Sequence, residues 1–234
     1  MTPLPHRLLA EFLGCLLLFA SVIGSGILAQ QLAAGNDGVA LLGNTLATVA
    51  MLGLLITILG PISGAQFNPA VTLVMALHER TPAASALAII AAQLLAAPAA
   101  VALAHAMFNQ PLFQIATHAR NTPGELLGEA VATFTLLLTI LGTLAHRPAA
   151  IALTVPAAIT AGYWWTSSTS FANPAITLAR AMTDSFSGIR PGDTPGFIAA
   201  QFAGALLALA VGRLLFTSSR SDIPPGPSSP APRD

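Results

Sequence analysis

Two copies of one tripeptide contain the residues of this sequence whose types and spacing are best suited to specific chemistry. The tripeptide is Asn-Pro-Ala, and its copies are Asn68, Pro69 and Ala70, and Asn173, Pro174 and Ala175. Asparagine is among the best N-cap residues, because its side-chain oxygen accepts a hydrogen bond from an unpaired N–H of the first turn. Proline is favoured at the first helical position, where its missing N–H costs nothing. Each copy therefore predicts the start of a helix, and it leaves the asparagine amide free to donate to a water molecule or a hydroxyl group.

The runs that follow the two asparagines are predicted to be short helices, 68–78 and 173–184. A helix of this length rises about 16 Å, which is roughly half of a bilayer core. The preceding segments, 61–67 and 166–172, are then non-helical backbone at membrane depth, which is tolerated only inside protein or beside an aqueous path. Two half-helices that meet at their asparagines therefore predict a pore. Their N-termini place partial positive charge at its centre, which repels cations and protons.

Two carboxylates, Glu11 and Glu129, lie inside apolar stretches, where an ionisable residue is by default a functional candidate. One interpretation is a proton relay. The other is structural support, in which each carboxylate accepts hydrogen bonds from the non-helical backbone of its own half. A relay needs a chain of partners and none is visible, so structural support is the better interpretation.

The remaining candidates favour neither metal binding nor catalysis. His105 shares an apolar stretch with Gln93, and no further ligand lies at metal-binding spacing, so a hydrogen-bonded buried side chain is the better interpretation. Nothing resembles a catalytic triad or a nucleophile elbow. The lone Cys15 cannot form a disulfide within the chain. We therefore expect no enzyme activity and no metal site.

The composition indicates an all-α integral membrane protein that lies in a lipid bilayer. Of the 234 residues, 54% are hydrophobic and 8% are charged, and the mean hydropathy is +0.74. A soluble domain usually carries about a quarter charged residues, so this chain cannot cover a globule with polar side chains. The net charge is zero and no basic stripe is present, which excludes nucleic acid as an expected partner.

Six apolar stretches are long enough to cross a bilayer core of about 30 Å. They are 8–30, 39–60, 83–108, 125–145, 149–167 and 196–216. The first is too long for the core of a signal peptide, so we expect a retained transmembrane helix. The Ser/Pro/Gly-rich segment 217–234 is predicted to be a disordered cytoplasmic tail.

The two halves of the chain, about 8–108 and 125–216, repeat one order of motifs. Each has a helix with a glutamate, a second helix, an Asn-Pro-Ala run and a helix with a glutamine, which is Gln93 or Gln201. Three spans per half mean that the second copy enters the membrane upside down, and inverted repeats place the working site near the midplane. The prediction is one channel domain, 1–216, with six transmembrane helices and two re-entrant half-helices.

The placement of arginines predicts the orientation. With the N-terminus in the cytoplasm, most arginines lie inside, as the positive-inside rule requires. Those inside are Arg7, Arg80, Arg147, Arg213, Arg220 and Arg233, and those outside are Arg120, Arg180 and Arg190. We therefore expect a multi-pass protein of the bacterial inner membrane with both termini in the cytoplasm.

The motifs "AEFLG", "SGAQFNPAVTL", "AAQ" and "SFANPA" resemble those of the major intrinsic protein family, the aquaporins and aquaglyceroporins, over residues 8–216. The resemblance implies an aquaporin-like fold, usually a homotetramer with one pore per subunit. It also implies passive transport of water or small uncharged solutes without a cofactor, and structural roles for Glu11 and Glu129.

The chain departs from that family at its selectivity filter. Most relatives carry arginine directly after the second Asn-Pro-Ala, where this chain has Ile176; the other three filter positions, counted without gaps from the asparagines, are Thr48, Ala161 and Ser170. Loss of the guanidinium removes a fixed positive charge and a fork of donors. We therefore expect a wide, uncharged ring that admits solutes larger than water, and cation exclusion that depends more on the helix dipoles.

Arg180 lies one helical turn after Ile176 on roughly the same face, nearer the outside. One hypothesis places it at the outer mouth as a weaker positive screen or a docking point for hydroxylated or anionic solutes. The alternative, which we place first, is an arginine that anchors the helix end at the interface or pairs with Asp184.

The sequence thus predicts a passive channel for water, glycerol-like polyols, urea or metalloid hydroxides. The chain resembles the bacterial subgroup of such channels linked to arsenite. As(OH)₃ is a neutral trihydroxy solute of about the shape of glycerol, so an aquaglyceroporin-like pore would pass both. An ion-coupled secondary transporter is the main alternative, although such proteins usually place acidic residues at the midplane, where this chain has Asn68 and Asn173. An ion channel is the second alternative.

Overall fold

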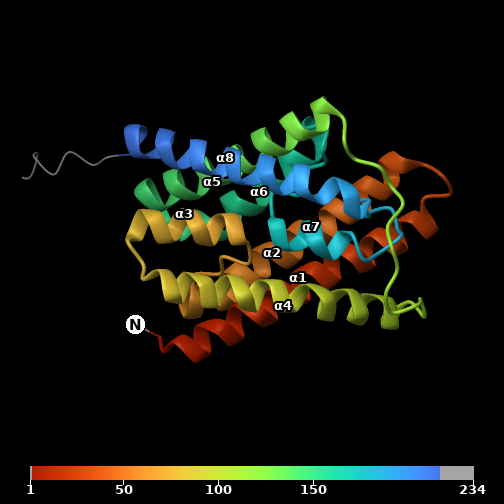
Figure 1. Cartoon of the computed structure of the whole chain (residues 1–234), viewed down its shortest axis with the longest axis horizontal. Coiled ribbons are helices and arrows are strands. Elements are labelled where there is room, and N and C mark those ends of the chain that lie inside the picture. Colours follow the sequence, from red (N-terminus) through yellow and green to blue (C-terminus); the bar gives the residue numbers. More distant parts are fainter. Residues whose placement is uncertain (1, 217–234) are drawn as a thin grey trace, which may run out of the picture.

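The computed structural model describes residues 2–216, all of whose regular elements are helices (Figure 1). The α-helices are α1 (Leu4–Leu32), α2 (Asp37–Ser63), α3 (Pro69–Glu79), α4 (Ala83–Met107), α5 (Pro123–His146), α6 (Ile151–Trp165), α7 (Pro174–Arg180) and α8 (Thr194–Leu215). Two 3₁₀ turns, η1 (Pro148–Ala150) and η2 (Pro191–Asp193), precede α6 and α8. The predicted tail, 217–234, lies outside the described residues.

The helix termini follow local sequence signals. Asn36 caps α2, since its side chain accepts a hydrogen bond from the backbone N–H of Val39 at 3.2 Å. A capping box of Thr122 and Glu125 opens α5. α2 ends at Ser63 and is capped by Gly64, whose φ of +92° lies in the left-handed region that glycine adopts without strain.

The eight α-helices form one bundle in two matching halves. α1 packs against α2 and α4, and α5 packs against α6 and α8, while α2 and α6 join the halves. Small residues permit the close approaches, as expected for helices that pack in lipid. A Cβ atom on Gly204 of α8 would lie 2.1 Å from the carbonyl oxygen of Ala130 in α5.

Five of the helices are long and apolar enough to span a membrane: α1, α2, α4, α5, and α8 together with η2. The sixth predicted span, 149–167, is shorter than expected, because its helix α6 has 15 residues. Its first residues form the 3₁₀ turn η1, and at Thr166 the backbone becomes extended and enters the segment before Asn173.

The half-helices α3 and α7 lie end to end in the middle of the bundle (Figure 1). The start of α1 and the end of α8 lie at the same end of the bundle, as an even number of crossings requires. The expectation that the second half-helix continues to about Asp184 is wrong, because α7 ends at Arg180. The carbonyls of Arg180, Ala181 and Met182 accept from the backbone N–H groups of the loop residues Ile189, Ala116 and Gln114.

Candidate functional site

Both asparagines of the repeated tripeptide cap their half-helices. The side-chain oxygen of Asn68 accepts from the backbone N–H of Ala70 at 2.9 Å and of Val71 at 3.4 Å. Asn173 makes the same contacts at the same distances with the next residues of α7, Ala175 and Ile176. The local signal of Asn followed by Pro therefore sets both helix starts.

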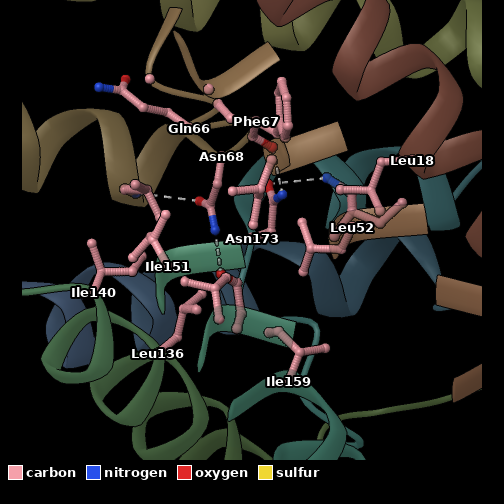
Figure 2. Close-up of a pocket in the computed structure, with 18 of the residues that line it drawn as sticks. Leu18, Leu52, Gln66, Phe67, Asn68, Leu136, Ile140, Ile151, Ile159 and Asn173 are labelled. Atoms are coloured by element: carbon pink, nitrogen blue, oxygen red, sulfur yellow. Dashed lines mark hydrogen bonds between the residues drawn. The ribbon is translucent and has the colours of Figure 1, made fainter. Parts of the chain in front are cut away.

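The two asparagine amides also connect the halves (Figure 2). Asn68 donates through Nδ2 to the carbonyl of Ala172 at 2.7 Å, and Asn173 donates to the carbonyl of Phe67 at 2.8 Å. The expectation that each amide is wholly free is therefore wrong, because one N–H of each is already used. Since an amide has two N–H groups, one donor on each asparagine remains for a passing solute.

The backbone that leads into each half-helix is strained in the same way in both halves. Ala65 and Phe67 before α3, and Ser170 and Ala172 before α7, have positive φ values between 48° and 51°. Each such residue costs of order 1 kcal/mol, and such strain persists only where the surroundings fix the conformation.

A buried carboxylate in each half holds this strained backbone in place. Glu11 accepts from the backbone N–H groups of Gln66 and Phe67 at 2.9 and 2.7 Å, and from the Ser63 hydroxyl at 2.7 Å. A glutamine then connects the carboxylate to the half-helix, since Gln93 lies 2.9 Å from both Glu11 and Thr72.

The second half repeats this arrangement with different residues. Glu129 accepts from the backbone N–H groups of Phe171 and Ala172, and Gln201 joins it to Thr177 through bonds of 2.8 Å. Both carboxylates are therefore occupied by the backbone of the re-entrant segments.

A cavity of about 340 Å³ passes the asparagines and extends along the bundle, and neither Glu11 nor Glu129 lines it. Its polar side consists of the two asparagines and the backbone of the re-entrant segments, and its other side is mainly leucine, isoleucine and valine (Figure 2). Arg7 lines the end near the start of α1, and Tyr163 and Arg180 line the opposite part. The arrangement is a path with one hydrogen-bonding side and one apolar side.

Three of the four predicted filter residues, Thr48, Ser170 and Ile176, line this cavity. Ala161 does not, because its side chain is exposed on the outside of α6. Counting along the chain did not follow the rotation of α6 about its axis, and position 161 lies on another face than the cavity-lining Ile159 and Tyr163.

Ile159 and Tyr163 of α6 line the cavity and were missed from the sequence. A helical face repeats at i, i+4, so Val155, Ile159 and Tyr163 share a face and Ala161 points away from it. Their apolar spacing was the signal that could have found them.

A bulky residue at position 161 is expected to leave glycerol permeation unchanged. Ala161→Phe should conduct within about twofold of the unchanged protein, because position 161 faces away from the path, whereas Thr48→Phe should reduce flux at least about fivefold by filling it. Swelling rates of proteoliposomes in glycerol measure both. Equal loss in the two variants would contradict the placement of α6.

Arg180 lies inside the bundle rather than at an exposed mouth. Its side chain is 3% exposed, and its Nε donates to the carbonyl of Ser187. Its guanidinium carbon lies 3.3 Å from the centroid of the Phe171 ring, which is a cation–π contact. A side chain so deeply buried does not anchor the helix end at the interface. Asp184 accepts instead from the backbone and hydroxyl of Thr117, so it does not pair with Arg180. Both parts of the alternative are therefore wrong.

The other candidate residues have structural surroundings. His105 is buried, with Nδ1 2.9 Å from the Leu112 carbonyl and Nε2 2.8 Å from the Thr183 hydroxyl. Cys15 is buried and unpaired. Within residues 2–216, no group of three or more histidine, cysteine or acidic side chains could hold a metal ion.

Known proteins resemble the chain in sequence and in fold. The family model described as "Major intrinsic protein" matches residues 2–163. Aquaglyceroporin AqpS from Rhizobium meliloti (strain 1021) is 50% identical over 217 residues, which cover 93% of each chain. The X-ray structure of the aquaglyceroporin from Plasmodium falciparum has the same fold, with a TM-score of 0.69 at 17% identity, covering 92% of this chain and 97% of that one.

Proposed function

We propose that this chain, which belongs to the major intrinsic protein family, forms a wide channel. Its filter has isoleucine where most relatives have arginine. The protein is a multi-pass membrane channel through which small solutes such as glycerol pass passively, and it is not an enzyme. The cavity beside Asn68 and Asn173 is the path proposed for these solutes.

The observation that supports polyol permeation is the two-sided lining of the cavity. A polyol has a hydrocarbon backbone and a row of hydroxyls, and the path offers an apolar side beside amide and backbone groups. Asn68 and Asn173 each keep one N–H for a hydroxyl. Thr48 also lines the path, and its buried hydroxyl has no hydrogen-bond partner within the described residues, so it could pair with a hydroxylated solute after a change of rotamer.

The proposed filter consists of Thr48, Ser170 and Ile176, with Tyr163 in place of Ala161. Ile176 leaves the room that an arginine would take, and Thr48 and Ser170 are small, while Tyr163 adds an aromatic ring where the sequence predicted an alanine. The neutral solutes that suit it are water, glycerol, urea and As(OH)₃, which has three hydroxyls and the approximate shape of glycerol. The relative that shares 50% of its residues with this chain is itself named an aquaglyceroporin.

For the assembled protein we propose a homotetramer in the bacterial inner membrane with both termini in the cytoplasm. Residues 1–216 form the channel domain in this proposal, as inverted repeats of about 8–108 and 125–216. Many leucines on the outer faces of the helices are exposed in the single chain, which suits contact with lipid or with other subunits. The arginine distribution supports the orientation.

Flux measurements on proteoliposomes test this function. We expect osmotic swelling with glycerol, urea or As(OH)₃ at rates at least about tenfold above protein-free vesicles, because the path removes the bilayer barrier. The rates should rise linearly with the gradient and should not change with an uncoupler. Asn68→Leu, which loses the cap and the donor, is the inactive control.

A secondary transporter behaves differently in the same assay. Uptake that saturates and collapses with an uncoupler would contradict a passive channel and favour ion coupling. Unitary currents in a planar bilayer would favour an ion channel instead.

A further inference from the structure

We propose that Arg180, one turn further along α7, supplies the pore with the fixed positive charge and the N–H donors that position 176 lacks. In this inference, which rests on the proposed channel function, Arg180 determines the charge selectivity of the path. It excludes cations and protons and hydrogen-bonds to the hydroxyls of passing solutes.

The position of Arg180 is the first argument. Ile176 and Arg180 lie four residues apart on one face of α7, and both line the cavity. The guanidinium is fixed on two sides, by the Phe171 ring at 3.3 Å and by the bond from Nε to the Ser187 carbonyl. A side chain held in this way loses little further freedom when a solute binds to it.

The free donors of Arg180 are the second argument. Within residues 2–216, the terminal amino groups of Arg180 have no hydrogen-bond partner, although the side chain is buried. A guanidinium has five N–H groups, and only the one on Nε is used here. The cavity that Arg180 lines is where the others can meet a solute.

The charge of Arg180 is not neutralised by an ion pair. The one ion pair in the described part of the chain joins Arg190 to Asp193. Glu129 lies behind the re-entrant backbone, where the N–H groups of Phe171 and Ala172 occupy it, and it does not line the cavity. Arg180 therefore acts on the path as a net positive charge.

A second guanidinium strengthens the positive potential. Arg120 is 7% exposed, lies 5.2 Å from the centroid of the same Phe171 ring, and donates through Nε to the Gly188 carbonyl at 3.0 Å. In the outer loop, desolvation lowers the pKa of His118, and the positive charges of Arg120 and Arg180 lower it further. The field of the two arginines thus reaches the loop beside the pore.

The half-helix dipole alone is a weak substitute for the missing charge. α7 has 7 residues, fewer than the predicted 173–184, so fewer peptide dipoles align at Asn173. Position 176 is aliphatic. A guanidinium in a narrow path of low dielectric has a much larger effect on an ion than one in water.

Arg180→Gln tests the inference, because glutamine retains hydrogen bonding without the charge. We expect potassium and proton leak through proteoliposomes to rise at least about tenfold over the unchanged protein, with glycerol flux retained. Arg180→Lys, which keeps the positive charge, should leak cations no faster than the unchanged protein. Ile176→Arg combined with Arg180→Gln should restore exclusion by returning a guanidinium one turn inward. Arg190→Gln, which removes an arginine whose side chain is 48% exposed, is the matched control and should not leak.

The outcomes separate this inference from the channel function. Absence of glycerol flux in the unchanged protein would overturn the proposed function itself. Glycerol flux with no rise in cation leak in Arg180→Gln, or equal leak in Arg190→Gln, would overturn the role of Arg180 alone. A measurement that needs no variant is the reversal potential of the unchanged protein in a salt gradient: residual conductance should prefer anions, and a preference for cations would overturn the inference.

Discussion

Ile176→Arg is expected to reduce glycerol permeability at least about tenfold, while water permeability falls by less than about twofold. Ile176 lines the path beside the capped asparagine, and its backbone N–H is already part of that cap. An arginine there would extend a long, charged side chain across the apolar side of the cavity. Water is small enough to pass beside it, and a polyol is not.

Stopped-flow light scattering on matched proteoliposomes measures both rates. Ile176→Leu, which conserves volume and polarity, should keep both within about twofold. If glycerol flux in Ile176→Arg stays equal to that of Ile176→Leu, position 176 does not control the width of the path. The added charge also lies near Arg180, so we expect the variant to fold less efficiently, and rates must be normalised to inserted protein.

Gly204→Ala is expected to produce the largest loss of stability among single methyl additions. The new Cβ would lie 2.1 Å from the Ala130 carbonyl oxygen and 3.1 Å from the Phe134 nitrogen, both backbone atoms of α5. Backbone cannot rotate away as a side chain can, so α5 and α8 must separate. Overpacking of this kind costs about 1–3 kcal/mol, and we expect the melting midpoint in detergent to fall by about 5 °C.

Gly124→Ala is the matched control, because Gly124 lies in α5, the helix that packs against α8, and its new methyl group would meet no atom within 4 Å. Its midpoint should match that of the unchanged protein. Similar midpoints for Gly204→Ala and Gly124→Ala, measured by fluorescence-detected size exclusion, would show that α5 and α8 adapt without cost.

The elements of the fold were largely predictable from the sequence, because membrane insertion restricts the backbone severely. Apolar stretches of sufficient length predict spanning helices, and the Asn-Pro pairs predict both half-helix starts at the residues where the structure has them. The repeat also paired Glu11 with Glu129, which occupy matching places beside the two re-entrant segments.

The features that the sequence did not predict depend on tertiary contacts that local patterns do not contain. The end of α7 at Arg180 is set by loop residues such as Ile189, whose backbone N–H donates to the carbonyl of Arg180, and no helix-ending signal marks that place. Ala161 was misplaced because counting along the chain ignores the rotation of α6 about its axis. Neither interpretation of Arg180, at the outer mouth or paired with Asp184, found its partner, because that partner is the Phe171 ring and a search for opposite charge does not find it.

The reciprocal donation between the asparagine amides and the opposite backbone has a consequence for biogenesis. The carbonyl of Phe67 is synthesised 106 residues before Asn173, the residue that donates to it, and Asn68 precedes its acceptor Ala172 by 104 residues. An early fragment of the chain therefore holds an incomplete centre with its polar groups unmatched. Both of these hydrogen bonds form only after the later half has entered the bilayer. Completion of the conduit is therefore a late step of assembly that requires both halves.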